Sequence, residues 1–401
     1  MRLSYKAIGK DGKVVVGLVE TKDINEAAVF LRTRELIPIT ITKKDKNSFL
    51  EAIPFIKRSK TSGLIFFTRQ LSSMLTSGLT LVRALEILRQ QVQGVYMLEV
   101  MEGIITDIEG GSSFSESIAK YPDMFSPIYV SIIKTAEESG LLDKALIRLA
   151  DNLEKQAKLR SSIKSALMYP IIVVMLMIAV VVIMMIFVIP QLSTLYENLN
   201  IPLPLPTQII VGMSRFFIVF WPLVIVFAFG AIWLYRRFSR SPSGKLIMDS
   251  IVLKLPIFGK LIEQTLLAEF TRTFGLLVGT GTLVVDALLQ TAGSAGNSLY
   301  KNAIIDVSKK VEKGLTIGDA MSSSLLFPPL LVQLVRIGEQ TGKLDESLIK
   351  ASEYFEREVD EQVKTLTTAM EPIIMIILGI GVAFLIISVI TPIYNLISSI
   401  Q

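Results

Sequence analysis

The chain has 401 residues, 51% of them hydrophobic and 19% charged, with a formal net charge of +5 and a mean hydropathy of +0.55. This balance is too apolar for a soluble protein and predicts membrane spans joined to charged soluble parts, while the modest positive charge does not indicate nucleic-acid binding. Because the chain contains no cysteine and no histidine, disulfides, thiol catalysis and the commonest general base and transition-metal ligand are excluded.

The first 45 residues read as a small α+β domain. Two alternating segments, 5–8 and 14–19, flank the turn sequence Gly-Lys-Asp-Gly, which predicts a β-hairpin. A helical pattern over 25–34 and an extended pattern over 37–42 follow it. Residues 46–62, which are polar and basic, are expected to be the linker of this domain.

An internal repeat dominates the rest of the chain. Phe67-Thr68-Arg69 returns 203 residues later as Phe270-Thr271-Arg272. The offset becomes 202 after one deletion, and it then aligns Phe125, Pro127, Glu137, Gly140, Asp143, Pro170 and Pro190 with Phe327, Pro329, Glu339, Gly342, Asp345, Pro372 and Pro392. Each repeat is therefore a soluble module followed by an apolar run between two prolines.

Each module, at 63–168 and 237–370, is expected to be a bundle of six helices with a long, charged last helix over 142–164 or 344–368. Gly78 and Gly281 mark the end of the first helix. Ser113-x-x-Glu116 fits a capping box, and Thr316-x-x-Asp319 answers it in the second copy.

Three apolar runs, 170–190, 216–235 and 372–392, contain no Asp, Glu, Lys or Arg. Each has about 20 residues, enough to cross a hydrocarbon core of about 30 Å. We predict transmembrane helices at 169–190, 215–236 and 371–393, and hence a mainly α membrane protein. Transporters generally need ionisable groups at membrane depth, so these runs favour anchoring over conduction.

Basic residues beside the spans set the expected orientation. Lys155, Lys158, Arg160 and Lys164 precede the first span, and Arg236, Arg237, Arg240 and Lys245 follow the second. Since cytoplasmic flanks carry the excess of Lys and Arg, the N-terminus and both modules are expected in the cytoplasm. The loop 191–214 and the tail 394–401 are then expected outside.

Two acidic positions recur in both copies, as Glu137 and Asp143 in the first and Glu339 and Asp345 in the second. One interpretation is structural, because an acid at the start of the long helix stabilises the helix dipole. The other is functional, as a divalent-cation site or a polar contact with a partner. These four acids are candidates only, and no metal-binding site is assigned. No catalytic or cofactor-binding residue is predicted.

The stretch 338–344, Gly-Glu-Gln-Thr-Gly-Lys-Leu, superficially suggests a phosphate-binding loop. Its glycine spacing is one residue short, and Leu344 replaces the Ser or Thr that would hold Mg²⁺. A glycine turn between two helices is the simpler interpretation, and we expect no nucleotide cofactor.

The duplicated Phe-Thr-Arg module, the turn from Gly338 to Asp345, and the span entries Tyr169-Pro170 and Glu371-Pro372 together resemble the GspF/PilC family. The N-terminal Tyr5-Lys6-Ala7 also looks like that family's, and one departure is Ala136 where the second copy has Gly338. Members are inner-membrane platform proteins of bacterial type II secretion systems and type IV pili.

The resemblance implies a non-enzymatic homo-oligomer in the bilayer. Its implied partners are a cytoplasmic hexameric assembly ATPase, pilins or pseudopilins, and other inner-membrane assembly proteins. Two alternatives stay open from the residues alone, a membrane transporter or channel component and a membrane-anchored enzyme. Whether the product is a pilus, a secretion pseudopilus or a DNA-uptake filament is not specified.

Overall fold

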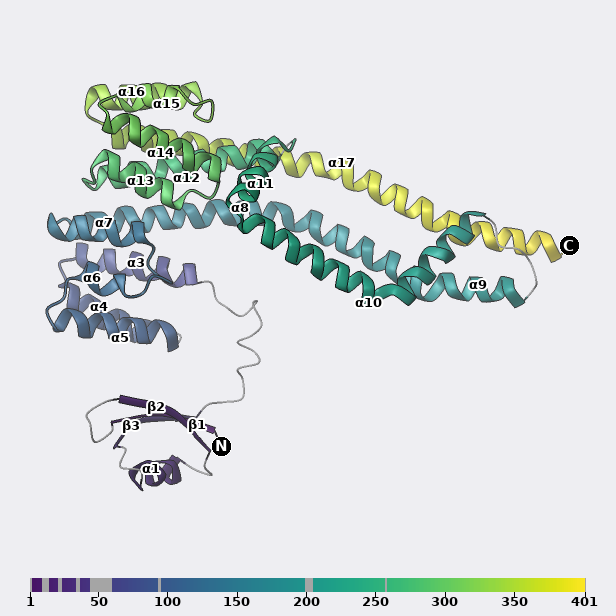
Figure 1. The fold of residues 1–401 in the computed structure, drawn as a ribbon, viewed down its shortest axis with the longest axis horizontal. Helices are drawn as coiled ribbons and strands as arrows, with labels where there is room; N and C mark the ends of the chain where they lie inside the picture. The colour runs from purple at the N-terminus through teal and green to yellow at the C-terminus, as the bar shows by residue number, and fades with distance from the viewer. Residues whose placement is uncertain are drawn as a thin grey trace. The chain divides into compact units, whose positions relative to one another are not determined.

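A computed structural model of the chain describes residues 2–8, 14–20, 24–33, 37–43, 60–92, 95–198, 205–256 and 258–400. The chain forms two units, Met1–Gly63 and Leu64–Gln401. Strands occur in the first unit, and helices make up the described elements of the second (Figure 1).

The first unit holds a three-stranded antiparallel sheet in the order β2-β1-β3. Its elements are β1 (Arg2–Ile8), β2 (Val14–Glu20), α1 (Ile24–Thr33) and β3 (Ile37–Lys43). Ala27 and Leu31, one helical turn apart on α1, are fully buried, so this face of the helix carries the apolar side chains. These elements lie where the sequence predicts a hairpin, a helix and an extended segment. The hairpin turn and residues 46–59 of the expected linker fall outside the described residues.

The first module consists of six helices among the described residues. They are α3 (Lys60–Thr76), α4 (Leu81–Gln91), α5 (Val95–Glu109), α6 (Phe114–Ala119), α7 (Pro127–Glu138) and α8 (Leu142–Ile183). The module core forms around Phe67, Phe125 and Tyr129. The ring centroid of Phe125 lies 5.7 Å from that of Phe67 and 5.2 Å from that of Tyr129. All three are at most 2% exposed, because the apolar faces of α3 and α7 and the turn that precedes α7 pack together.

The second module repeats this order after one extra helix, α11 (Pro242–Lys254). Its six helices are α12 (Phe258–Gly279), α13 (Val284–Ser294), α14 (Ser298–Glu312), α15 (Ile317–Ser322), α16 (Pro329–Thr341) and α17 (Leu344–Ile400). Phe270 and Phe327 occupy the places of Phe67 and Phe125, with ring centroids 5.6 Å apart. Six helices repeat between the modules as expected, but the expected second module at 237–370 also contains α11 and so has seven.

Turn chemistry explains where these helices end and begin. Gly78 and Gly281 follow the first helix of each module at φ of 90° and 91°, a conformation that only glycine adopts without strain. Ser113 and Glu116 form the predicted capping box, and Thr316 accepts a bond from the Asp319 amide. The shared local chemistry gives both modules the same helix boundaries.

The last helix of each module runs unbroken into the apolar segment. Pro170 lies inside α8, and α17 reaches Ile400, so the expected module boundary at 168/169 and the expected tail 394–401 both fall within continuous helices. A helix tolerates an internal proline when the lost bond and the ring clash are absorbed locally. Two helical stretches, Leu142–Gln191 and Leu344–Ala383, are long and apolar enough to cross a membrane.

The expected loop 191–214 is largely helical instead. A short π-helical turn, η1 (Met184–Val188), leads from α8 into α9 (Ile189–Asn198), and α10 (Leu205–Arg240) begins before the predicted second span. Apolar residues recur at helical spacing in these flanks. The segments on both sides of the expected loop are therefore helical beyond the bounds of the predicted spans. The second span itself, within α10, stays a prediction because many of its side chains lie outside the described residues.

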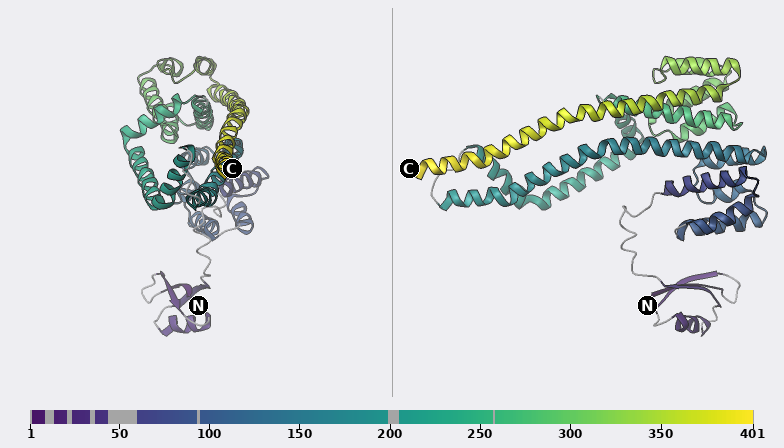
Figure 2. Two further views of the ribbon diagram at one scale, coloured as in Figure 1. Left: turned by 90° about the vertical axis from the view of Figure 1, so that its right-hand side faces the viewer. Right: turned by 180° about the vertical axis from the view of Figure 1, so that it is seen from behind.

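The two modules share one hydrophobic core, and α8 and α17 run side by side away from it (Figure 2). A second apolar cluster joins these helices where they leave the modules, through Leu159 of α8, Val359 and Leu366 of α17, and Leu261 of α12. Farther along, Leu176 and Ile380 are 67% and 66% exposed. Such continuous exposed apolar surface suits a lipid environment.

Candidate functional site

An arginine clamps the first helix of each module to the last one. Arg69 donates to Glu154 over 2.7 Å and 2.6 Å and to Asp151 over 2.5 Å. Arg272, its repeat, donates to Glu356 over 3.0 Å and 2.8 Å. The forked guanidinium suits such carboxylate contacts and lowers the pKa of Glu154 by hydrogen bonding. The repeat identifies the Phe-Thr-Arg motif, but the motif alone does not indicate which carboxylates its arginine binds.

The signal for these clamps was present in the repeat. Glu154 and Glu356 are themselves related by the offset of 202, as are the long helices that carry them. The burial of the two arginines differs, since the side chain of Arg69 is 32% exposed and that of Arg272 only 7%. The clamp of the second module is therefore the more shielded from water.

The repeated glutamates are caps of the short helices. The Glu137 carboxylate accepts from the amides of Phe114 and Ser115 over 2.7 Å and 3.0 Å, at the first turn of α6. Glu339 accepts from Ile317 and Gly318 of α15 over 2.9 Å and 3.3 Å. The expectation that they cap the long helices is corrected, because α7 and α16 place them beside α6 and α15 instead. Each carboxylate thus satisfies amides that the helix leaves unpaired.

The repeated aspartates lie in the first turns of the long helices, Asp143 on α8 and Asp345 on α17. Asp345 also approaches Arg148 of the other module, with 3.8 Å between its Oδ2 and the guanidinium. Within the described ranges, no group of three or more acidic side chains comes together as a metal site would require. Of the four acids predicted from the sequence, Asp345 is the one that the structure places at the boundary between modules.

That boundary is polar at its rim and carries charges of one sign on each side. Arg148 on α8 donates to the Gly279 carbonyl over 2.7 Å. Lys155 lies 3.5 Å from Glu353, and Arg160 lies 3.8 Å from Glu269. In all of these contacts the cation belongs to the first module and the acceptor to the second.

We call the two sides of this contact the basic face and the acidic face. The basic face belongs to α7 and α8 and consists of Ile128, Ser131, Thr135, Arg148 and Lys155. The acidic face belongs to α12, the turn after it, and α17, and consists of Glu269, Leu276, Gly279, Thr280, Asp345 and Glu353.

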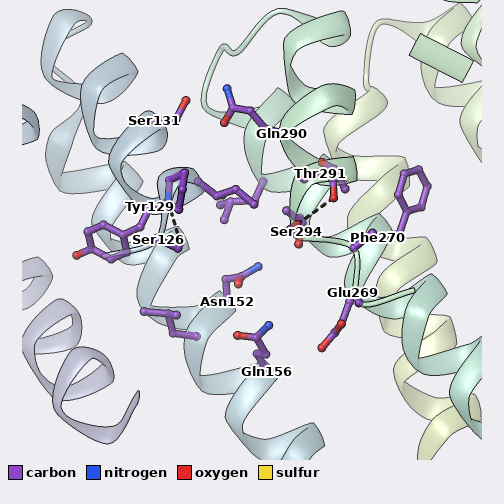
Figure 3. A pocket seen from close by; sticks show the side chains of 18 of the residues that line it. Ser126, Tyr129, Ser131, Asn152, Gln156, Glu269, Phe270, Gln290, Thr291 and Ser294 are labelled. Atoms are coloured by element: carbon purple, nitrogen blue, oxygen red, sulfur yellow. Dashed lines mark hydrogen bonds between the residues drawn. The ribbon is translucent and has the colours of Figure 1, made fainter. Parts of the chain in front are cut away.

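A cleft of about 810 Å³ opens between the two modules, lined by α7, α8, α12, α13 and the start of α14. Figure 3 shows Asn152 and Gln156 of α8 on one side and Glu269 of α12 and Gln290 of α13 on the other. The Gln290 Oε1 is buried and has no hydrogen-bond partner. The lining is mainly apolar, with amides, hydroxyls and the charged side chains of Arg160 and Glu269 set among the apolar ones, a composition typical of a binding cleft.

The duplication is also what known proteins share with this chain. The family model for type II secretion system protein F matches residues 67–190 and again 270–392. The chain is 35% identical to the type IV pilus assembly protein PilC of Thermus thermophilus over 400 residues, which is 99% of this chain and 98% of that protein.

Other relatives come from both kinds of system. The type IV pilus assembly protein TapC of Aeromonas hydrophila is 32% identical over 98% of this chain and 94% of its own length. The type II secretion system protein F of the same organism is 26% identical over 91% of this chain and 95% of its own length. The two matched regions coincide with the two helical modules and their apolar extensions. The chain therefore belongs to the family of type II secretion system protein F.

Proposed function

We propose that the chain is a non-enzymatic inner-membrane platform that couples a cytoplasmic assembly ATPase to the polymerisation of pilins or pseudopilins. The observation that carries the proposal is the continuity of α8 and α17, each of which begins in a soluble module and ends in an apolar segment of membrane length. The pilus-assembly and secretion relatives support the same conclusion.

The long helices supply the mechanical link. With 42 and 57 residues, α8 and α17 extend about 60 Å and 85 Å at the usual rise of an α-helix. A displacement imposed on a module is passed along such a helix, since the described residues contain no loop between the module and the apolar segment. The arginine clamps and the shared core keep both modules rigid enough to transmit it.

The arrangement in the membrane is part of the proposal. The N-terminal domain and both modules lie in the cytoplasm, three helices cross the bilayer at 169–190, 215–236 and 371–393, and the C-terminus lies outside. The basic flanks of the first two spans and the uncharged tail support this orientation. Two modules of equal orientation need one extra crossing between them, which α10 provides.

The energy comes from a partner in this account, because the chain carries no phosphate-binding loop in its sequence. Partners are a hexameric ATPase on the cytoplasmic side, pilins or pseudopilins in the bilayer, other inner-membrane assembly proteins, and further copies of the chain. The cleft between the modules is a candidate docking site for a segment of the ATPase.

Co-purification tests this proposal. The full chain, solubilised in mild detergent, is expected to retain the assembly ATPase of the same cell on an affinity column. Gln290→Leu with Asn152→Leu alters the polar lining of the cleft and is expected to weaken retention, whereas Lys309→Glu, an exposed change on α14, is the control. Failure of the unaltered chain to retain the ATPase, or ATP hydrolysis by the purified chain alone, contradicts the proposal.

A further inference from the structure

Each module carries both of the faces that meet inside the chain, because the modules are copies of one unit. The basic face of the first module covers the acidic face of the second. The basic face of the second module and the acidic face of the first are left without a module against them. We propose that these two faces bind each other between neighbouring copies of the chain, head to tail.

Two of the three charged pairs of the internal contact have charged counterparts of the same sign at the outer faces. At the offset of 202, Arg148 and Lys155 correspond to Lys350 and Arg357 of α17. Their acceptors Asp345 and Glu353 correspond to Asp143 and Asp151 of α8. The internal pairs Arg148–Asp345 and Lys155–Glu353 are thus expected to be repeated as Lys350–Asp143 and Arg357–Asp151 across two copies. Arg357 then shares the Asp151 carboxylate with Arg69 of the same clamp. The charge signs agree at all four positions.

Burial distinguishes the used basic face from the unused one. Ile128, Ser131 and Thr135 on α7 are half-buried. Their counterparts on α16, which are Leu330, Gln333 and Ile337, are all exposed, with Leu330 at 40% and Ile337 at 47%. The same register positions are therefore partly buried in one module, where Ile128 and Ser131 also line the cleft, and exposed in the other. Exposed Leu and Ile beside two cations are what an unoccupied docking face presents.

The acidic faces show the same contrast. Leu276 is buried in the second module, and Glu269, Gly279 and Thr280 are half-buried there. The residues at these positions of the first module, offset by 203, are all exposed: Phe66, Ser73, Thr76 and Ser77. A Cβ on Gly281 would lie 4.0 Å from Thr135, whereas at Gly78 nothing lies within 4 Å. The first module has the matching surface without the matching neighbour.

A second copy is the occupant that these observations favour. The shape and charge order of the open faces repeat those of a contact that the chain already makes with itself. A contact of two different faces generates a ring of two or more copies if the rotation closes, and a filament if it does not. In a ring, first and second modules alternate around the assembly.

The contact between copies is expected to be weaker than the internal one. The third internal pair, Arg160–Glu269, is replaced by Gln362 and Phe66, which carry no charge. Leu276 is replaced by Ser73, which removes apolar area from the interface. A module contact weakened in this way suits an assembly that forms from intact chains, whereas the internal contact is permanent.

Cysteine crosslinking tests the proposal directly, since the chain has no cysteine of its own. Ile337→Cys with Ser77→Cys places one thiol on each open face, and a short bismaleimide in native membranes is expected to give covalent dimers or larger oligomers. Thr135→Cys with Thr280→Cys is the matched control at the equivalent internal positions. It is expected to lose both thiols while remaining a monomer on a denaturing gel.

Single variants decide between arrangements. Neither Ile337→Cys nor Ser77→Cys alone is expected to crosslink, while membranes containing both single variants give a dimer and nothing larger. If the double variant stays monomeric while the internal control loses its thiols, the proposal is overturned. Crosslinking of Ile337→Cys alone also overturns it, because that outcome requires a symmetric contact between identical faces.

Charge reversal gives a second readout. Lys350→Glu and Asp143→Lys each place like charges opposite each other, and each is expected to lower the yield of crosslinked or native oligomer about tenfold. Combining them restores opposite charges, and the yield is expected to recover, with Lys309→Glu on α14 as the control. Unchanged oligomer in Lys350→Glu, or a combined variant no better than the single ones, overturns the pairing.

Discussion

In each module a glutamate that is distant in sequence caps the N-terminus of a short helix. Glu137 accepts two backbone amides and the Ser115 hydroxyl, the last over 2.7 Å, so that the first turn of α6 is fully satisfied. Glu339 does the same at α15 with two amides. Because the acceptor is charged and faces the positive end of a helix, its loss leaves several donors unpaired.

Glu137→Gln is therefore expected to lower the free energy of unfolding by about 1–2 kcal/mol. The glutamine amide keeps the shape of the side chain but loses the charge. Its NH2 group also faces a backbone N–H donor where the carboxylate offered an acceptor. Thermal unfolding of the detergent-solubilised chain, followed by circular dichroism, measures the change. Glu138→Gln, an exposed neighbour on the same helix, is the control and is expected to leave the midpoint where it was.

The two arginine clamps are expected to differ in strength. Arg272→Met leaves Glu356, 21% exposed, without its partner and is expected to cost about 3 kcal/mol. Arg69→Met breaks a pair with more water around it and is expected to cost less than about 1 kcal/mol. Denaturant titration of the two variants compares them. Equal losses from the two changes contradict the assignment of the buried clamp to the second module.

At the scale of elements, helices α12 and α17 approach each other at a glycine. A Cβ at Gly275 would lie 3.0 Å from the Leu348 Cβ, tighter than ordinary contact, so the two helices pack backbone against side chain there. The sequence showed small residues at this place in both copies, Gly275 and Gly279 in one and Ser72 and Thr76 in the other. The close approach explains the glycine in the second copy.

Gly275→Val is expected to push α17 away from α12 and to destabilise the second module by about 1–3 kcal/mol. Gly293→Ala on α13 is the matched control, because nothing lies within 4 Å of its added Cβ. Limited proteolysis of the membrane-embedded chain reports on the second module, which is expected to be cut faster in the valine variant alone. Resistance equal to that of the unaltered chain would show that the helices are not packed here.

Much of the element order could be predicted because its signals are local. The Ser113–Glu116 box and the glycine turns at Gly78 and Gly281 each lie within a few residues of the helix ends that they define. The cap by Glu137 joins residues 23 positions apart, which no local pattern contains. Pro170 lies inside α8 without ending it, because a long apolar helix absorbs the local cost of a proline.

At the scale of the whole molecule, duplication is what the sequence revealed most fully. The repeat offset predicted two modules, each with an apolar extension, and the described helices follow it. The contact between the modules could not be predicted, because Arg148 meets Gly279 over 131 positions and no pattern along the chain specifies which faces meet. Once the contact is known, the repeat offset identifies the equivalent faces that remain open, which are the basic face of the second module and the acidic face of the first.

Rigid continuity between module and membrane segment is expected to be required for function. An insertion of seven Gly and Ser residues after Thr367 interrupts α17 between the second module and the apolar run, and it is expected to abolish filament or pseudopilus assembly. Seven alanines at the same place add about two helical turns and keep the helix continuous, so they are expected to retain much more activity. Assembly that is equal in the two insertions contradicts mechanical transmission through α17.

Removal of the chain from the living cell tests the platform role most directly. A deletion strain, complemented or not with the unaltered chain, is scored by electron microscopy for surface filaments and by gel for secreted proteins, with ATPase and pilin levels checked as controls. The account predicts that filaments or secretion disappear without the chain and return with it, while the ATPase and the pilins are still made. Normal filaments and normal secretion in the deletion strain would contradict it.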